Sequence, residues 1–307
     1  MDDVLSDVFR LLRLKSCVYF LHDFHAPWGM RVDAGLFAQF HLVARGTCTI
    51  ETDAGSLEAE TGDVILFPHG ARHTLADKPG GPVIAGNTVV EAIGGGTQIF
   101  AGDGPSTRLI CGHFEYDNDI RHPLIKDLPE IIHVESFAAL APGATDTVVP
   151  MLIDELAAQR SGNRIVVERL AEVLLIQVLR AYFVKTPHLQ GFLSAVSDSR
   201  LARAIGLIHQ NPERPLRLGD LARAAGMSRS GFAAEFRAVT NLSPIAYLTQ
   251  WRMYRARELL LTSDLPLGQI AAKQGYESDV AFSRAFKRAF AVSPASIRRA
   301  ANGARRA

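Results

Sequence analysis

One pattern occurs twice in the chain: LARAAGMSRSGFAAEF at residues 221–236 and IAAKQGYESDVAFSRAF at residues 270–286. In each copy a glycine, Gly226 or Gly275, follows a short amphipathic segment, where a helix commonly ends in the left-handed conformation. A serine that can cap the next helix comes shortly afterwards, and two phenylalanines four residues apart share one face of that helix. Each copy is therefore predicted to form two helices joined by a tight turn, so the duplication indicates a pair of helix-turn-helix units.

A long helix is predicted between the two copies, at residues 245–261. A rigid rod at this place fixes the separation of the two units, so that their second helices fit successive major grooves of a duplex, about 34 Å apart. The inner face of the rod is expected to hold Leu248, Trp251, Met253, Ala256, Leu259 and Leu260, and its outer face Arg252, Arg255 and Arg257.

The second helix of each unit is predicted to meet DNA. Arg284 is expected to recognise a base, because arginine pairs bidentately with guanine. The other basic side chains are expected to contact phosphates, which give affinity without sequence information; these are Arg229, Arg237, Lys287 and Arg288. The complete predicted set is Arg229, Ser230, Ala233 and Arg237 in the first copy, and Asp279, Val280, Ser283, Arg284, Lys287 and Arg288 in the second.

The charge of the chain is divided unequally along its length. Residues 195–307 hold 18 Lys and Arg against 8 Asp and Glu, a net charge of +10. Subtracting these from the 33 basic and 32 acidic residues of the whole chain leaves 15 and 24 for the rest, a net charge of −9. The basic part indicates a polyanionic partner such as DNA, whereas the acidic part would gain nothing from lying on DNA.

The first half of the chain has a different pattern. Between residues 17 and 135, short apolar runs alternate with turn signals, which favours a β-sandwich or small barrel. Helices are predicted at residues 146–160 and 164–184, and their apolar stripes are expected either to pack on the barrel or to form a dimer seam. The predicted fold class is α+β with two domains: a β-barrel domain at 1–135, a helical pair and linker at 136–190, and an all-α domain with two helix-turn-helix units at 191–307.

The C-terminal pattern resembles the AraC/XylS family of bacterial transcription regulators over about residues 198–299. The resemblance rests on segments that include Gly226-Met227-Ser228-Arg229-Ser230, Trp251-Arg252-Met253, Gly275-Tyr276 and Phe282-Ser283-Arg284-Ala285-Phe286-Lys287. It implies sequence-specific DNA binding, with base contacts at Ser230, Ala233 and Ala234 in the first unit and at Val280, Ala281 and Arg284 in the second. Since alanines stand at two of the first three positions, the first unit is expected to position the protein more than it specifies sequence.

The N-terminal β region resembles cupins. Residues 62–77 (GDVILFPHGARHTLAD) fit the second cupin motif with Asp77 in place of Asn, and Gly35 followed by His41 matches the opening of the first motif. Val43 then replaces a metal-binding histidine, and Cys48 stands at the glutamate position. The resemblance implies a sensor barrel.

Two kinds of site are predicted in this barrel. The first is an effector pocket for an unknown small molecule, lined by Trp28, Phe40, His41 and His73. The second is a divalent metal site, for example for zinc, built from His41, Cys48, His73 and Cys111. The alternative is that the histidines are hydrogen-bonded core residues and Cys48 is a small buried apolar one.

The predicted function is a sequence-specific DNA-binding transcription regulator, not an enzyme, controlled by a small molecule or metal in the barrel. The alternatives are a cupin-type metal enzyme fused to a DNA-binding module, and a constitutive DNA-binding protein whose barrel only dimerises. Expected partners are double-stranded promoter or operator DNA, the effector and a second copy of the chain, with RNA polymerase as a candidate and no membrane. Three cysteines and no apolar run of membrane-spanning length favour a cytoplasmic protein.

Overall fold

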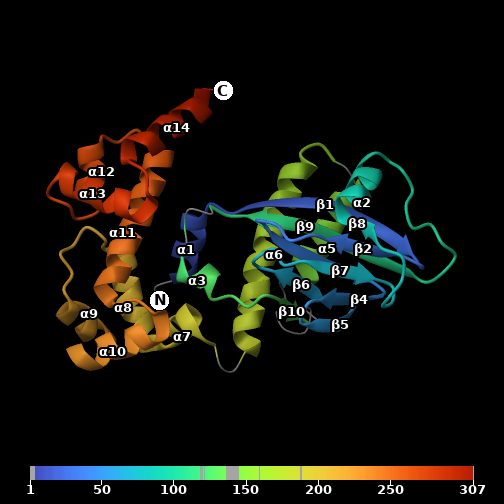
Figure 1. Cartoon of the computed structure of the whole chain (residues 1–307), viewed down its shortest axis with the longest axis horizontal. Helices are drawn as coiled ribbons and strands as arrows, with labels where there is room; N and C mark the ends of the chain where they lie inside the picture. The colour runs from blue at the N-terminus through green and yellow to red at the C-terminus, as the bar shows by residue number, and fades with distance from the viewer. Residues whose placement is uncertain are drawn as a thin grey trace. The chain divides into compact units, whose positions relative to one another are not determined.

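The computed structural model describes residues 4–117, 120, 122–135, 145–158, 160–186 and 189–306. The chain forms two compact units, neither of which is a single continuous segment. Residues 14–116 and 128–187 form one, here called the sheet unit. Residues 1–13, 117–127 and 188–307 form the other, here called the helical unit (Figure 1). The predicted α+β class with two domains is confirmed.

The sheet unit contains two five-stranded sheets, ordered β1-β9-β3-β6-β10 and β5-β4-β7-β2-β8. Their facing sides enclose an apolar core that includes Phe24, Trp28, Ile65, Phe67 and Leu75. The strands are β1 (Lys15–His25), β2 (Gly29–Val32), β3 (Ala38–Arg45), β4 (Thr47–Thr52), β5 (Gly55–Glu60), β6 (Val64–Phe67), β7 (His73–Ala76), β8 (Ile84–Ala85), β9 (Ser106–Glu115) and β10 (Ile132–Val134).

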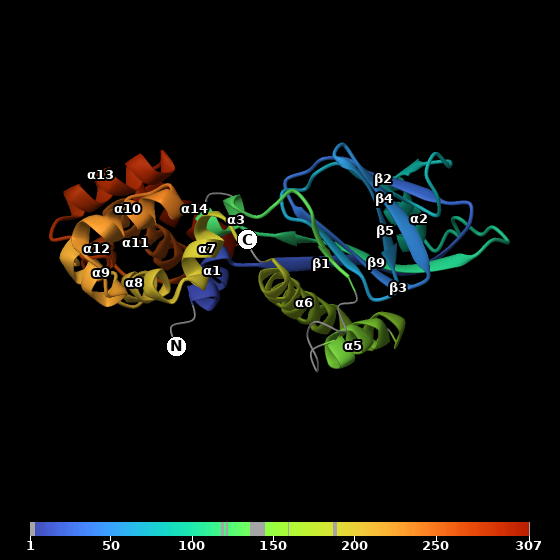
Figure 2. The ribbon, with the colours of Figure 1, turned by 90° about the horizontal axis from the view of Figure 1, so that it is seen from below.

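The described residues of this unit also form the helices α2 (Gly86–Gly94), α5 (Thr145–Ala158) and α6 (Asn163–Lys185). Figure 2 shows α5 and α6 side by side next to the sheets. Phe40 and Phe114, on β3 and β9, point away from the core and meet Leu174 and Val178 of α6. The predicted packing of the helical pair on the barrel is therefore present for α6, and the dimer seam stays a prediction.

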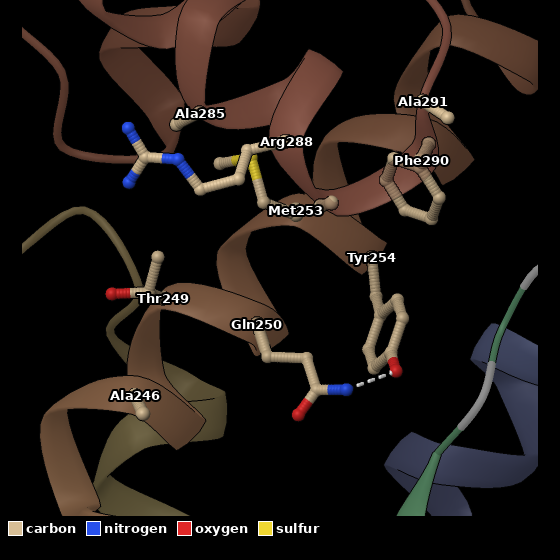
Figure 3. Close-up of a pocket in the computed structure, with 10 residues that line it drawn as sticks. Ala246, Thr249, Gln250, Met253, Tyr254, Ala285, Arg288, Phe290 and Ala291 are labelled. Carbon is tan, nitrogen blue, oxygen red and sulfur yellow. Dashed lines mark hydrogen bonds between the residues drawn. The ribbon is translucent and has the colours of Figure 1, made fainter.

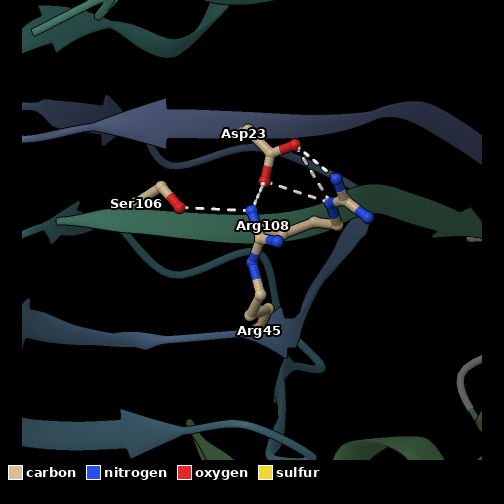
Figure 4. A network of polar contacts seen from close by, with 4 residues as sticks. All are labelled: Asp23, Arg45, Ser106 and Arg108. Atoms are coloured by element: carbon tan, nitrogen blue, oxygen red, sulfur yellow. Dashed lines mark hydrogen bonds and ion pairs between the residues drawn. The ribbon is translucent and has the colours of Figure 1, made fainter.

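A polar cluster ties three strands of the first sheet together (Figure 4). Asp23 on β1 accepts hydrogen bonds from Arg108 on β9 and from Arg45 on β3, and Arg45 also donates to Ser106. The pKa of Asp23 is lowered, mainly by the hydrogen bond from Arg108. Burial acts in the opposite direction, and the charges of Arg108 and Arg45 lower the pKa further. The cluster fixes the relative register of the strands that carry Tyr19, His41 and Cys111, which matter for the pocket described below.

The helical unit contains both helix-turn-helix units. Gly226, with φ of 69°, ends the first helix of the first unit, and the Ser228 side chain accepts a hydrogen bond from the Gly231 amide. The Ser278 side chain caps the corresponding helix of the second unit. The helices of this unit are α1 (Val4–Leu12), α3 (Pro123–Lys126), α7 (Gly191–Ser197), α8 (Ser199–Gln210), α9 (Leu218–Ala225), α10 (Arg229–Thr240), α11 (Pro244–Thr262), α12 (Leu267–Lys273), α13 (Asp279–Phe290) and α14 (Pro294–Arg306).

The structure departs from the sequence-based expectations in two places. α1 and α3, which fall in the range predicted as the barrel domain, pack within the helical unit, because α1 contacts α8 and α11 and α3 contacts α7. Residues 187–188 of the predicted linker lie outside the described residues. Arg257, predicted on the outer face of α11, is buried, because Asp117 forms an ion pair with it.

Candidate DNA interface and barrel pocket

The second helix of each unit, α10 or α13, buries one face and exposes the other. Phe232 and Phe236 on α10, and Phe282 and Phe286 on α13, are completely buried, as their spacing predicts. The opposite faces hold the ten side chains predicted to meet DNA. Eight of these are exposed, and Ala233 and Ser283 are half-buried.

The basic side chains of these two faces differ from four other arginines of the helical unit. Arg200, Arg252, Arg255 and Arg298 donate to carboxylates or backbone carbonyls and so stabilise the fold. Within the described ranges, no ion pair engages the predicted DNA-contacting cations, which are Arg229, Arg237, Arg284, Lys287 and Arg288. Their charges are therefore free to meet phosphates or bases.

The side chains of α13 gather at one place. Asp279, Val280, Ser283, Arg284 and Lys287 line a shallow surface hollow of about 370 Å³, so five of the six residues predicted for this helix lie together. Val280 remains 60% exposed. Val280 can make an apolar contact with a thymine methyl group, and the guanidinium of the neighbouring Arg284 can donate two hydrogen bonds to a guanine.

Arg288, the sixth predicted residue, lies at a second hollow, between α11 and α13 (Figure 3). This hollow has a volume of about 640 Å³ and is lined by Thr249, Gln250 and Tyr254 from α11 and by Phe290 from α13. The Gln250 amide donates a hydrogen bond to the Tyr254 hydroxyl, which holds both side chains at the floor. Arg288 is thus placed beside the rod that joins the two units, one helical turn from Arg284.

The barrel pocket lies in the sheet unit and has a volume of about 450 Å³. Its wall is formed by β1, β2, β3, β9 and α2, with Phe20, Met30 and Val90 as apolar side chains. Polar groups come from Tyr19, Arg31, Asp33, Gln39, Asn87 and Glu91, and His41 and Cys111 also line the pocket. Sequence reasoning missed the α2 wall, although Val89, Val90 and Ile93 have helical spacing.

Three of the four predicted pocket residues do not line the pocket. Trp28 is completely buried and stacks on Phe24 in the core. Phe40 faces α6, because side chains alternate along β3 and His41 occupies the inward position. His73 is buried beside His41 but does not line the pocket. Of the predicted residues, only His41 therefore reaches the pocket.

His41, His73 and Cys111 form a hydrogen-bonded chain whose proton positions follow from its last acceptor. The Ala71 carbonyl oxygen, 2.7 Å from His73 Nδ1, can only accept, so Nδ1 carries the proton and Nε2 accepts. His41 Nε2, 2.7 Å away, donates to it, which leaves His41 Nδ1 to accept from the Cys111 thiol at 2.9 Å. Burial lowers the pKa of His73 to about 4 and that of His41 well below its usual value, so both rings are neutral.

This chain does not fit the predicted metal site. Cys111 and His73 engage opposite nitrogens of the His41 ring, so the three side chains cannot meet at one ion. Burial raises the pKa of Cys48 to about 12, so its thiol is protonated in the metal-free barrel. No three His, Cys, Asp or Glu side chains are arranged to hold a metal ion in the part of the chain that the structure describes. The arrangement instead matches hydrogen-bonded core histidines, the alternative considered above.

Comparisons with known proteins agree with the two-part architecture. The cupin family profile matches residues 3–184, and a helix-turn-helix domain profile matches residues 221–300. An AraC-like transcription regulator of Streptomyces lividans is 31% identical over 300 residues, which cover 97% of this chain and 98% of the relative. The HTH-type transcriptional regulator AlkR of Acinetobacter baylyi is 29% identical over 97% of this chain and 99% of its own.

One solved structure, the DNA-binding domain of AdpA in complex with a target DNA, aligns with 35% of this chain and 96% of its own at 31% identity, with a TM-score of 0.33. None of the helices in the described residues is long and apolar enough to cross a membrane.

Proposed function

The chain belongs to the AraC-like family of DNA-binding transcription regulators, and from this premise we propose that a small molecule bound in the barrel pocket controls how it binds DNA. The observation that carries the DNA-binding part is the set of exposed basic side chains on α10 and α13, which form no ion pair with any other residue that the structure describes. The pocket of about 450 Å³ supports the effector part, because it joins apolar walls to a few polar groups.

Control by an effector requires that the ligand bind one arrangement of the protein more tightly than another. Both ring nitrogens of His41 are hydrogen-bonded, to Cys111 and to His73, which supports a small-molecule site in preference to a metal site. Pairing with a second copy of the chain and contact with RNA polymerase stay predictions. The function is tested by fluorescence anisotropy with duplexes selected from a random library, and the absence of any selected duplex would contradict it.

Arg284→Ala is expected to weaken binding to the selected duplex by about 1–3 kcal/mol and to relax specificity at one base pair. The reason is that an arginine fork discriminates guanine from other bases, whereas alanine cannot. Lys287→Ala, on the same helix, is the matched control and should weaken binding to all sequences about equally. If Arg284→Ala also weakened all sequences equally, Arg284 would be a phosphate contact.

Val90→Trp is expected to fill the barrel pocket and abolish effector binding, because Val90 lines the pocket from α2. Metabolites that raise the thermal unfolding temperature of the wild-type chain would first be identified by screening. Val184→Trp, at a position 80% exposed on α6, is the matched control and should keep the response. A metabolite response that survives Val90→Trp would place the effector outside this pocket.

A further inference from the structure

We infer that α1, Asp117 and residues 122–127, although they flank strands of the sheet unit, position the two recognition helices, with Asp7 acting on α10 and Asp117 acting on α13. This inference rests on the proposed DNA-binding function and adds residues outside the helix-turn-helix segment to it. Both acidic residues act through other side chains and are therefore positioning residues.

α1 is part of the helical core. Val4, Val8, Leu11 and Leu12 on its inner face are at most 2% exposed, and the helix contacts α8 and α11. The burial of four aliphatic side chains stabilises this attachment substantially. α1 is therefore an integral layer of the unit that holds the helix-turn-helix pair.

Asp117 and residues 122–127 are held by the same core. The Asp117 amide donates to the Leu12 carbonyl at 3.1 Å, which joins this segment to the end of α1. The His122 ring is completely buried among the rings of Phe192, Tyr247, Trp251 and Tyr254. Asp127 accepts from the Phe192 amide at 2.7 Å, so the segment is fixed at both ends.

A contact route leads from Asp7 to the first recognition helix. Asp7 lies 3.4 Å from Nδ1 of the buried His209, and His209 Nε2 lies 2.7 Å from the Tyr247 hydroxyl. The Tyr247 ring packs edge-on against Phe236, the completely buried anchor of α10, with ring centroids 5.8 Å apart. A displacement of α1 therefore changes the support beneath α10.

A second route leads from Asp117 to the second recognition helix. Asp117 forms an ion pair with Arg257 on α11, and both side chains are largely buried. The Arg257 guanidinium lies over the Phe290 ring at 5.8 Å, and Phe290 packs on Phe286, the buried anchor of α13. The two routes share α11 but end on different helices.

The chain connects both routes to the barrel pocket. β1 and β9 pair with Lys15 opposite Glu115, and these strands carry the pocket residues Tyr19 and Cys111. α1 ends at Leu12 shortly before β1 begins, and Asp117 follows the end of β9 after a single residue. A ligand that shifts these two strands would pull on Asp7 and Asp117 through a few residues of backbone.

The test is hydroxyl-radical footprinting of the full chain on a selected duplex, with variants Asp7→Asn and Asp117→Asn. Arg284→Ala first identifies the groove that α13 occupies. We expect Asp117→Asn to weaken protection about tenfold in that groove and to leave the neighbouring groove unchanged, with the opposite result for Asp7→Asn. Asp117→Glu, which keeps the charge, should restore the footprint. Asp154→Asn removes an exposed ion pair with Arg160, outside the pocket and both recognition helices, and is the matched control.

Partial unfolding of the helical unit would weaken both grooves together, so equal losses in both grooves, or none, would overturn the inference. A wild-type chain without a footprint would instead overturn the proposed function, and this inference with it.

Hydrogen exchange of the wild-type chain provides a second measurement that needs no variant. DNA binding is expected to slow exchange of the α1 amides and of the Asp117 amide, because coupling between two sites is reciprocal; unchanged exchange there would contradict the inference.

Discussion

Phe282→Ala is expected to lower the free energy of unfolding of the helical unit by about 3–5 kcal/mol, the cost of emptying a fully buried aromatic site. Phe282 is completely buried and contacts the core formed by Met253, Leu260, Ile270 and Phe286. The loss approaches the total stability of a small domain, so α13 should separate from α11 near room temperature. Specific DNA binding is then expected to disappear, since one of the two recognition helices is lost.

The two tryptophans allow this loss to be assigned to one unit, because Trp28 lies in the sheet unit and Trp251 in the helical unit. In a Trp28→Phe background, urea denaturation followed by fluorescence reports on Trp251 alone. Val292→Ala, at a position 40% exposed between α13 and α14, is the control and should change stability by less than about 0.5 kcal/mol. A Phe282→Ala loss below about 1 kcal/mol would contradict the assignment of this side chain to the core.

The helix-turn-helix pair could be predicted from sequence because its signals are local. Gly226, Ser228 and Ser278 act within a few residues, and the structure confirms all three in their capping roles. The buried phenylalanines follow from four-residue spacing, which needs no knowledge of the rest of the fold. The amphipathic rod at α11 was predicted in the same way.

Contacts between distant segments could not be predicted. Arg257 stands beside other arginines on α11, so a local pattern indicates an exposed face, but its partner Asp117 comes from the segment after β9. The same limit explains the pocket. The first cupin motif identified His41, but only the strand register places Phe40 towards α6 and brings Tyr19 and Cys111 to the wall.

Acidification is expected to destabilise the sheet unit strongly between pH 6.5 and pH 4. Burial lowers the pKa of His73 from 6.5 to about 4, and it lowers the pKa of His41 in the same direction. Above pH 6.5 both histidines are neutral in the folded and the unfolded chain, so the full stability is present. As the pH falls below 6.5, these histidines become protonated in the unfolded chain but stay neutral in the folded chain. Stability is therefore lost until the pH reaches the pKa of the histidine in the folded chain. At about 1.4 kcal/mol for each pH unit, His73 alone lowers the free energy of unfolding by about 2 kcal/mol at pH 5 relative to pH 7.

The measurement is urea denaturation at pH 7 and pH 5 in a Trp251→Phe background, where fluorescence reports on Trp28 and therefore on the sheet unit. His73→Asn removes the titrating group, so this variant is expected to be less stable at pH 7 but to lose about 2 kcal/mol less between the two pH values. Proton NMR of the imidazole rings follows the protonation directly. A His73 midpoint near 6.5 would mean that the ring is open to water, and the neutral chain from Cys111 through His41 to His73 would then be wrong, together with the argument against a metal that depends on it.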